Sequence, residues 1–83
     1  MTKVVFRKFA DGEIIALFPE EIFAGYLVSS YMHVGQHSEA DYARMIAVTK
    51  PATKEEYADL YKELQQVGYD DLKVIKRKPT KKH

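Results

Sequence analysis

Two histidines and two carboxylates alternate within residues 31–41, the segment whose side chains come closest to carrying chemistry. On an extended strand, residues at alternate positions project to the same face. A metal ion needs ligand atoms about 2 Å away, but His33 and His37 on a straight strand lie roughly 13 Å apart. We therefore expect no metal site here unless the chain bends sharply at Gly35.

The same segment is better suited to binding a small ligand or a partner. Aromatic stacking, hydrogen-bond donors and acceptors come together around a glycine, a combination typical of recognition surfaces. Two arginines elsewhere are candidates to contact an anionic ligand. The candidate ligand or partner surface consists of Tyr31, His33, Gln36, His37, Arg7 and Arg44.

Catalytic motifs are not recognisable in the sequence. Ser38 adjoins His37, but neighbouring side chains on a strand point to opposite faces, so the pair predicts no nucleophile and base. The four glycines are isolated from one another, so none of them belongs to a phosphate-binding loop. We expect a protein that is not an enzyme and that holds no cofactor.

Alternating apolar residues predict most of the strands. Residues 3–9 and 13–18 read as a hairpin around Asp11-Gly12, a pair suited to a two-residue turn. Pro19 is expected to end the second strand. Residues 26–36 predict a third strand, 38–41 a polar loop and 43–49 a fourth strand, with a short helix over 39–46 as the alternative.

The clearest helix signal starts at Thr53, which forms a Thr-x-x-Glu capping box with Glu56. Apolar residues then recur at helical spacing as far as Val67, and Gly68 is suited to the left-handed position after a helix. Residues 72–77 predict a closing strand. The fold class is therefore α+β: a mostly antiparallel sheet of about five strands, in the order four strands, helix, strand, with one helix packed on one face.

Both faces of the first two predicted strands are apolar, but a single helix covers only one face of a sheet. The second face must then meet a curled part of the same sheet, a partner protein or another copy of the chain, and a short chain gains stability by self-association. We expect a homo-oligomer. The candidate oligomer face consists of Val5, Phe9, Ile15 and Leu17.

Composition indicates one domain, residues 1–77, followed by a basic tail, residues 78–83. The chain has 83 residues and no cysteine, and its net charge is +1. Residues 1–72 hold 7 basic against 12 acidic residues, whereas residues 73–83 hold 6 basic residues and no acid. Basic charge without stacking aromatics predicts weak nucleic-acid binding at most. Charge interrupts the first apolar run, so we expect a cytoplasmic protein without membrane contact.

Several phrases of the sequence resemble a group of short proteins from bacteriophages and bacterial mobile elements. They are FRKFADGEIIALFP (6–19), YMHVGQH (31–37), TKPAT (49–53), EY (56–57) and VGY (67–69). The resemblance brings no established activity, but it implies a phage setting. There, small proteins bind a host protein or sequester a signalling molecule.

The function expected from the sequence is that of an oligomeric, phage-type binding or interaction module acting on a host protein. The first alternative is a protein that binds or sequesters a small anionic ligand, such as a nucleotide signal. The second is a weak nucleic-acid-associated protein that acts through its basic end.

Overall fold

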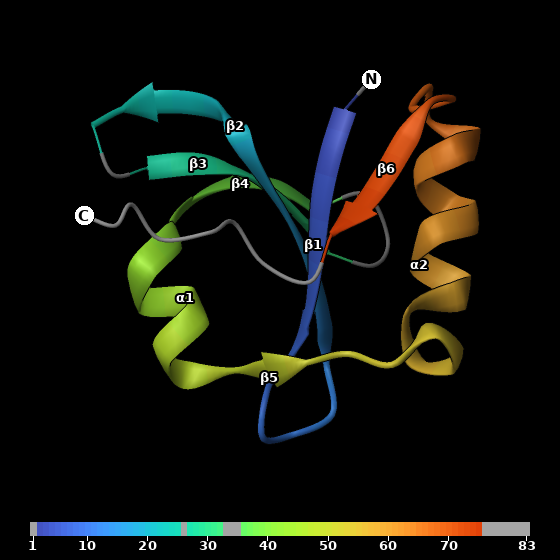
Figure 1. Cartoon of the computed structure of the whole chain (residues 1–83), viewed down its shortest axis with the longest axis horizontal. Coiled ribbons are helices and arrows are strands. Elements are labelled where there is room, and N and C mark those ends of the chain that lie inside the picture. Colours follow the sequence, from blue (N-terminus) through green and yellow to red (C-terminus); the bar gives the residue numbers. More distant parts are fainter. Residues whose placement is uncertain (1, 26, 33–35, 76–83) are drawn as a thin grey trace.

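The computed structural model describes residues 2–25, 27–32 and 36–75, which form a six-stranded, mostly antiparallel sheet between two helices (Figure 1). The elements are β1 (Thr2–Lys8), β2 (Ile14–Ala24), β3 (Leu27–Met32), β4 (Gln36–Asp41), α1 (Tyr42–Val48), β5 (Lys50–Pro51), α2 (Lys54–Gln66) and β6 (Leu72–Ile75). The expected α+β class is confirmed.

The strands follow the order β4-β3-β2-β1-β5, and β6 lies beside β1 on the same edge as β5. β5 pairs antiparallel with the end of β1, whereas β6 pairs parallel with its beginning, Thr2–Val5. The chain reaches β6 from β5 through α2, and this crossover helix packs on one face of the sheet (Figure 1). Two separate strands therefore share one edge of β1.

The predicted hairpin of β1 and β2 is present, but its loop has three residues rather than two. The Phe9 N–H donates to the Glu13 carbonyl at 2.8 Å, and the Gly12 N–H donates to the Phe9 carbonyl at 2.9 Å. Gly12 has φ +94°, so it takes the left-handed position that closes such a three-residue loop.

Pro19 does not end β2, which continues to Ala24. The recorded pairing of β2 with β1 reaches only to Leu17, and the register against β3 shifts between Phe18 and Ile22, so Pro19 lies beyond the regular part of both ladders. A proline is tolerated there because no regular ladder bond needs its missing N–H.

The segment after β3 differs most from the expectation. The polar residues expected to form a loop, Ser38 to Asp41, belong to strand β4, and the expected strand over 43–49 is helix α1. Asp41 caps this helix by accepting a hydrogen bond from the Arg44 N–H at 3.2 Å. The short helix kept as an alternative for this region is closer to the structure, although it is displaced toward the C-terminus.

Because α1 is present, both faces of the sheet are covered. On the α2 side, Leu60 and Leu64 pack against Val4, Phe6 and other core residues. On the α1 side, Val5, Ile15 and Leu17 are at most 4% exposed, and Tyr42, Met45 and Ile46 of α1 pack with them and with partly buried Phe9. These are the residues expected to form an oligomer face, and that expectation is corrected: they belong to the second core of the same chain.

Both ends of α2 follow the prediction. The Thr53 hydroxyl accepts from the Glu56 N–H at 3.2 Å, and the Glu56 carboxylate accepts from the Thr53 N–H at 2.8 Å. At the other end, Gly68 has φ +121°, and the N–H groups of Gly68 and Tyr69 donate to the carbonyls of Gln65 and Leu64. This is the Schellman arrangement that a left-handed glycine permits.

Glu56 also joins α2 to β1. Its carboxylate lies 2.5 Å from the Lys8 ammonium, and this contact, together with the Thr53 N–H, holds the pKa of Glu56 below its ordinary value of 4.5. Because the pKa is lower in the folded protein, the contacts of the Glu56 carboxylate stabilise the fold at neutral pH. This contribution is lost as the pH falls from 4.5 through the lowered pKa of Glu56.

Replacing Thr53 with alanine is expected to lower the free energy of unfolding by about 1 kcal/mol, because the Glu56 N–H loses its acceptor. Chemical denaturation measures this loss, with Thr53→Ser as the control that keeps the hydroxyl. Equal midpoints for the wild type and the alanine variant would show that the cap contributes nothing.

No helix in the described part of the chain is both long and apolar enough to cross a membrane.

Candidate functional site

Tyr31 lies in the core rather than on a recognition surface. Its side chain is 1% exposed, and its hydroxyl donates to the Glu63 carboxylate of α2 at 2.6 Å. The residue therefore fastens β3 to α2. Its placement in the candidate ligand surface is wrong.

Replacing Tyr31 with phenylalanine is expected to cost about 1.5 to 3 kcal/mol of folding free energy, because a hydrogen bond to a charged group is lost while the ring stays packed. Thermal or chemical unfolding tests this, with Tyr42→Phe on the opposite face as a comparison. If Tyr31→Phe were as stable as the wild type but no longer bound a ligand, Tyr31 would be a binding residue rather than a structural one.

Arg7 is also structural, although it was expected to contact an anion. It is 5% exposed, and it donates from Nε to the Thr49 hydroxyl at 2.9 Å. One terminal nitrogen donates to the carbonyls of Ile46 at 3.0 Å and Thr49 at 2.7 Å. A cation at this end of α1 meets both the last carbonyls and the negative end of the helix dipole. Arg7 therefore closes the C-terminus of α1.

The rest of the candidate ligand surface is not brought together with Tyr31. Arg44 is exposed on α1, which packs on the opposite face of the sheet from Tyr31. Gln36 and His37 lie in β4, where their backbones pair with Met32 and Tyr31, and His33 lies outside the described residues. Within the described residues, no group of three or more potential metal ligands gathers around one point.

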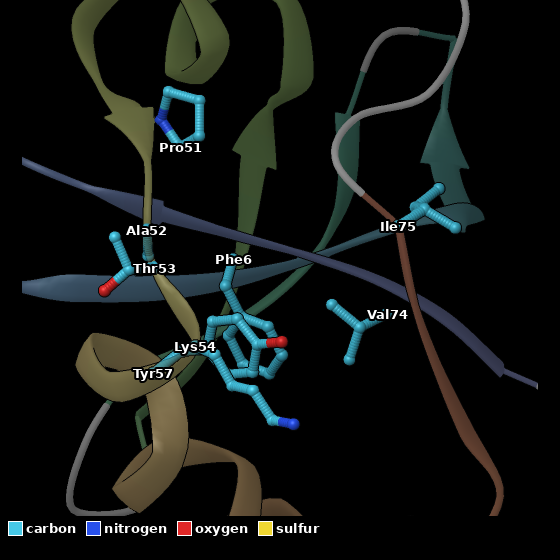
Figure 2. Close-up of a pocket in the computed structure, with 8 residues that line it drawn as sticks. All are labelled: Phe6, Pro51, Ala52, Thr53, Lys54, Tyr57, Val74 and Ile75. Atoms are coloured by element: carbon cyan, nitrogen blue, oxygen red, sulfur yellow. The ribbon is translucent and has the colours of Figure 1, made fainter.

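The structure instead forms a groove on the α2 side of β6. Its first part has a volume of about 530 Å³ and lies between the start of α2 and β6, with Phe6 of β1 between them (Figure 2). A second part, of about 460 Å³, continues along α2 and shares Lys54, Tyr57 and Val74 with the first. Together they are lined by Phe6, Pro51, Ala52, Thr53, Lys54, Tyr57, Ala58, Tyr61, Lys62, Gln65, Val74 and Ile75. We call this the α2–β6 groove.

Aromatic rings form the base of the α2–β6 groove. Tyr57 stacks on Phe6 with their ring centroids 4.3 Å apart, and Tyr61 meets Phe6 edge to face at 6.3 Å. Val74 faces Phe6 and Tyr57 from β6 (Figure 2). Its side chain remains 36% exposed. The groove therefore presents apolar surface that the described part of the chain does not fully cover.

The charge of the groove is opposite to that of the body of the protein. Lys54 and Lys62 line it, both are exposed, and neither forms an ion pair with any described residue. Among the described residues, no aspartate or glutamate lines it. The other flank of α2 differs, because the pocket there is lined by Glu13, Glu56 and Asp59. The groove therefore combines apolar surface with two positive charges, on a domain whose first 72 residues carry five more acids than bases.

Sequence reasoning missed this site because its members come from three distant segments. Tyr57 and Tyr61 belong to the residues that recur at helical spacing after Thr53, a pattern typical of a core-facing helix, and Val74 belongs to the expected closing strand. The available signal was the spacing of Lys54, Tyr57, Ala58, Tyr61, Lys62 and Gln65, which recur every three or four residues. Only the parallel pairing of β6 with β1 places Val74 opposite this stripe.

Comparison of the chain with protein-family models, with curated proteins and with solved structures found no match.

Proposed function

We propose that this protein is a non-enzymatic binding module that recognises a protein partner through the α2–β6 groove. The observation that carries the proposal is a groove with partly exposed Tyr57 and Tyr61, two lysines that pair with no described residue, and no carboxylate among the described residues that line it. Exposed apolar surface edged by polar residues is typical of interaction sites. Charge of one sign selects a partner of the opposite sign.

The resemblance to small phage and mobile-element proteins supports a host protein as the partner. Self-association is not needed for this function, because α1 covers the apolar face that had favoured an oligomer. The proposal assigns the binding surface to α2 and β6 rather than to the candidate surface around Tyr31 and Arg7, because both of these residues are buried and hydrogen-bonded in the fold.

A photo-crosslinking side chain placed at Gln65 tests the proposed function in the cells that produce the protein. Gln65 is exposed and lines the groove. The control is the same side chain at Ala43, which is exposed on α1 across the sheet. We expect a discrete crosslinked protein from position 65 only. No crosslink from either position would contradict a binding function, and a crosslink from position 43 alone would contradict this surface.

One observation favours a second candidate, a small anionic aromatic ligand such as a nucleotide. The stacked Phe6–Tyr57 pair lies beside Lys54, so a base could stack in the groove while a phosphate meets the lysine. A saturable rise in melting temperature with a nucleotide, lost in Lys54→Glu, would favour this candidate, because ligands stabilise the state that they bind. If no nucleotide raises it, the candidate is excluded.

A further inference from the structure

Two residues of β6, Val74 and Ile75, line the α2–β6 groove. Within the described residues β6 pairs only with β1. The Thr2 N–H of β1 donates to the Asp71 carbonyl at 3.1 Å. This bond shows which residues of β6 direct their backbone groups toward β1, because successive residues of a strand direct theirs to opposite sides. Residues 73 and 75 then direct their backbone groups toward β1, and Leu72 and Val74 direct theirs to the free edge. An added strand would find donors and acceptors at these two residues.

The dimensions of the groove suit an extended chain. Its stripe on α2 runs from Lys54 to Gln65. At the helical rise this is about 16 Å, which is the length of roughly five residues of a strand. Side chains of an added strand alternate between the two faces. Every second side chain would therefore point to the α2 side, where Tyr57, Tyr61 and Val74 offer apolar contact.

Charge decides among the possible occupants. The chain's own residues 76–83 hold five lysines and arginines and no acid, so their positive charge would be repelled by Lys54 and Lys62. A second copy paired through β6 about a two-fold axis would set the lysines of both copies against each other. An acidic segment of another protein has neither problem, and its carboxylates would pair with lysines that no described residue neutralises.

We propose that β6 accepts an extended segment of a partner protein as an additional strand, and that this segment alternates acidic and apolar residues. Pairing of the main chain with Leu72 and Val74 supplies affinity, and the groove selects the side chains, as in other cases of strand addition. This inference rests on the proposed function and names the form of the partner.

Selection from a displayed library of random peptides tests it; peptides of about ten residues exceed the length of the edge. We expect enriched peptides in which Asp or Glu alternates with apolar residues. Val74→Pro should weaken the selected peptides by about tenfold or more, since it removes one outward N–H donor and a lost hydrogen bond of about 1.4 kcal/mol is a factor of ten. Val74→Thr keeps the donor and a similar shape, so it should bind nearly as the wild type does.

Amide hydrogen exchange in the wild-type protein provides a readout that does not depend on a variant. A bound peptide should slow exchange at Leu72 and Val74, whose amides face the free edge, more than at Lys73 and Ile75, which already face β1. The opposite pattern would contradict strand addition.

Other outcomes also overturn the inference. These are the absence of enrichment, enrichment of basic peptides, equal binding by Val74→Pro, and a dimer that Val74→Pro dissociates. If any of these is found while the crosslink from Gln65 is still obtained, the partner binds the groove as a folded surface. The proposed function then survives without strand addition.

Discussion

Replacing Leu17 with alanine is expected to lower the free energy of unfolding by about 2 to 5 kcal/mol, the range for a leucine truncated in a packed core. Leu17 is fully buried between the sheet and α1, in the same cluster as Val5, Ile15 and Val28. Small domains have only about 5 to 15 kcal/mol to lose. The variant should therefore be folded only marginally, and chemical denaturation monitored by circular dichroism measures the effect.

The matched control is Val48→Ala, because Val48 belongs to α1 but is 49% exposed. A change of within about 0.5 kcal/mol is expected there. Light scattering on the folded proteins separates the two interpretations of the sheet's second face. If Leu17→Ala leaves stability unchanged but lowers the mass, Leu17 belongs to an interface between copies, and α1 does not cover the face.

Replacing Arg7 with methionine should destabilise the domain by roughly 2 to 4 kcal/mol. The variant keeps the length of the side chain but leaves the carbonyls of Ile46 and Thr49 without the guanidinium, and each buried acceptor left unpaired costs about 1 to 3 kcal/mol. The loss should fall first on α1, so amides of residues 42–48 should exchange faster than those of α2.

Arg44→Met is the control for Arg7, since it removes the same charge from an exposed position on α1. Arg7→Lys should recover only part of the stability, because one ammonium cannot reproduce donors placed on several guanidinium nitrogens. Equal stability of Arg7→Met and Arg44→Met would contradict the role of Arg7 in closing α1.

Local signals in the sequence were sufficient for the hairpin and for α2. The capping box at Thr53 and the left-handed Gly68 depend on residues within one turn, so they act wherever the helix packs. The hairpin was found for the same reason, although its three-residue loop was not. Asp11-Gly12 fits a two-residue turn equally well, and only the pairing of Phe9 with Glu13 distinguishes the two.

The region from Gln36 to Thr49 was mispredicted because its local signals are weak. β4 is an edge strand with polar residues such as Ser38 and Glu39, a pattern that is also typical of a loop. α1 has only seven residues, and its Met45, Ile46 and Val48 resemble a strand. Its stability comes from packing on Val5 and Leu17 and from Arg7, which lies about forty residues earlier in the chain.

The candidate ligand or partner surface was mispredicted for a related reason. Residue type marked Tyr31 and Arg7 as recognition groups, but both satisfy their polar atoms inside the fold. Buried polar groups of this kind are regularly hydrogen-bonded, so their chemistry is used for structure. The α2–β6 groove joins Phe6, Tyr57 and Val74, and the sequence contains no information on that contact without the parallel pairing of β6.

The most direct test of the central claim is the affinity of the partner crosslinked from Gln65 for two charge-reversal variants. Lys54→Glu/Lys62→Glu inverts the charge of the α2–β6 groove, and Arg44→Glu inverts an exposed charge on the other face of the sheet. We expect the groove variant to bind at least about tenfold more weakly, a loss of about 1.4 kcal/mol, while Arg44→Glu binds as the wild type does. Full affinity in the groove variant, with a loss in Arg44→Glu, would contradict the assignment of the binding surface to α2 and β6.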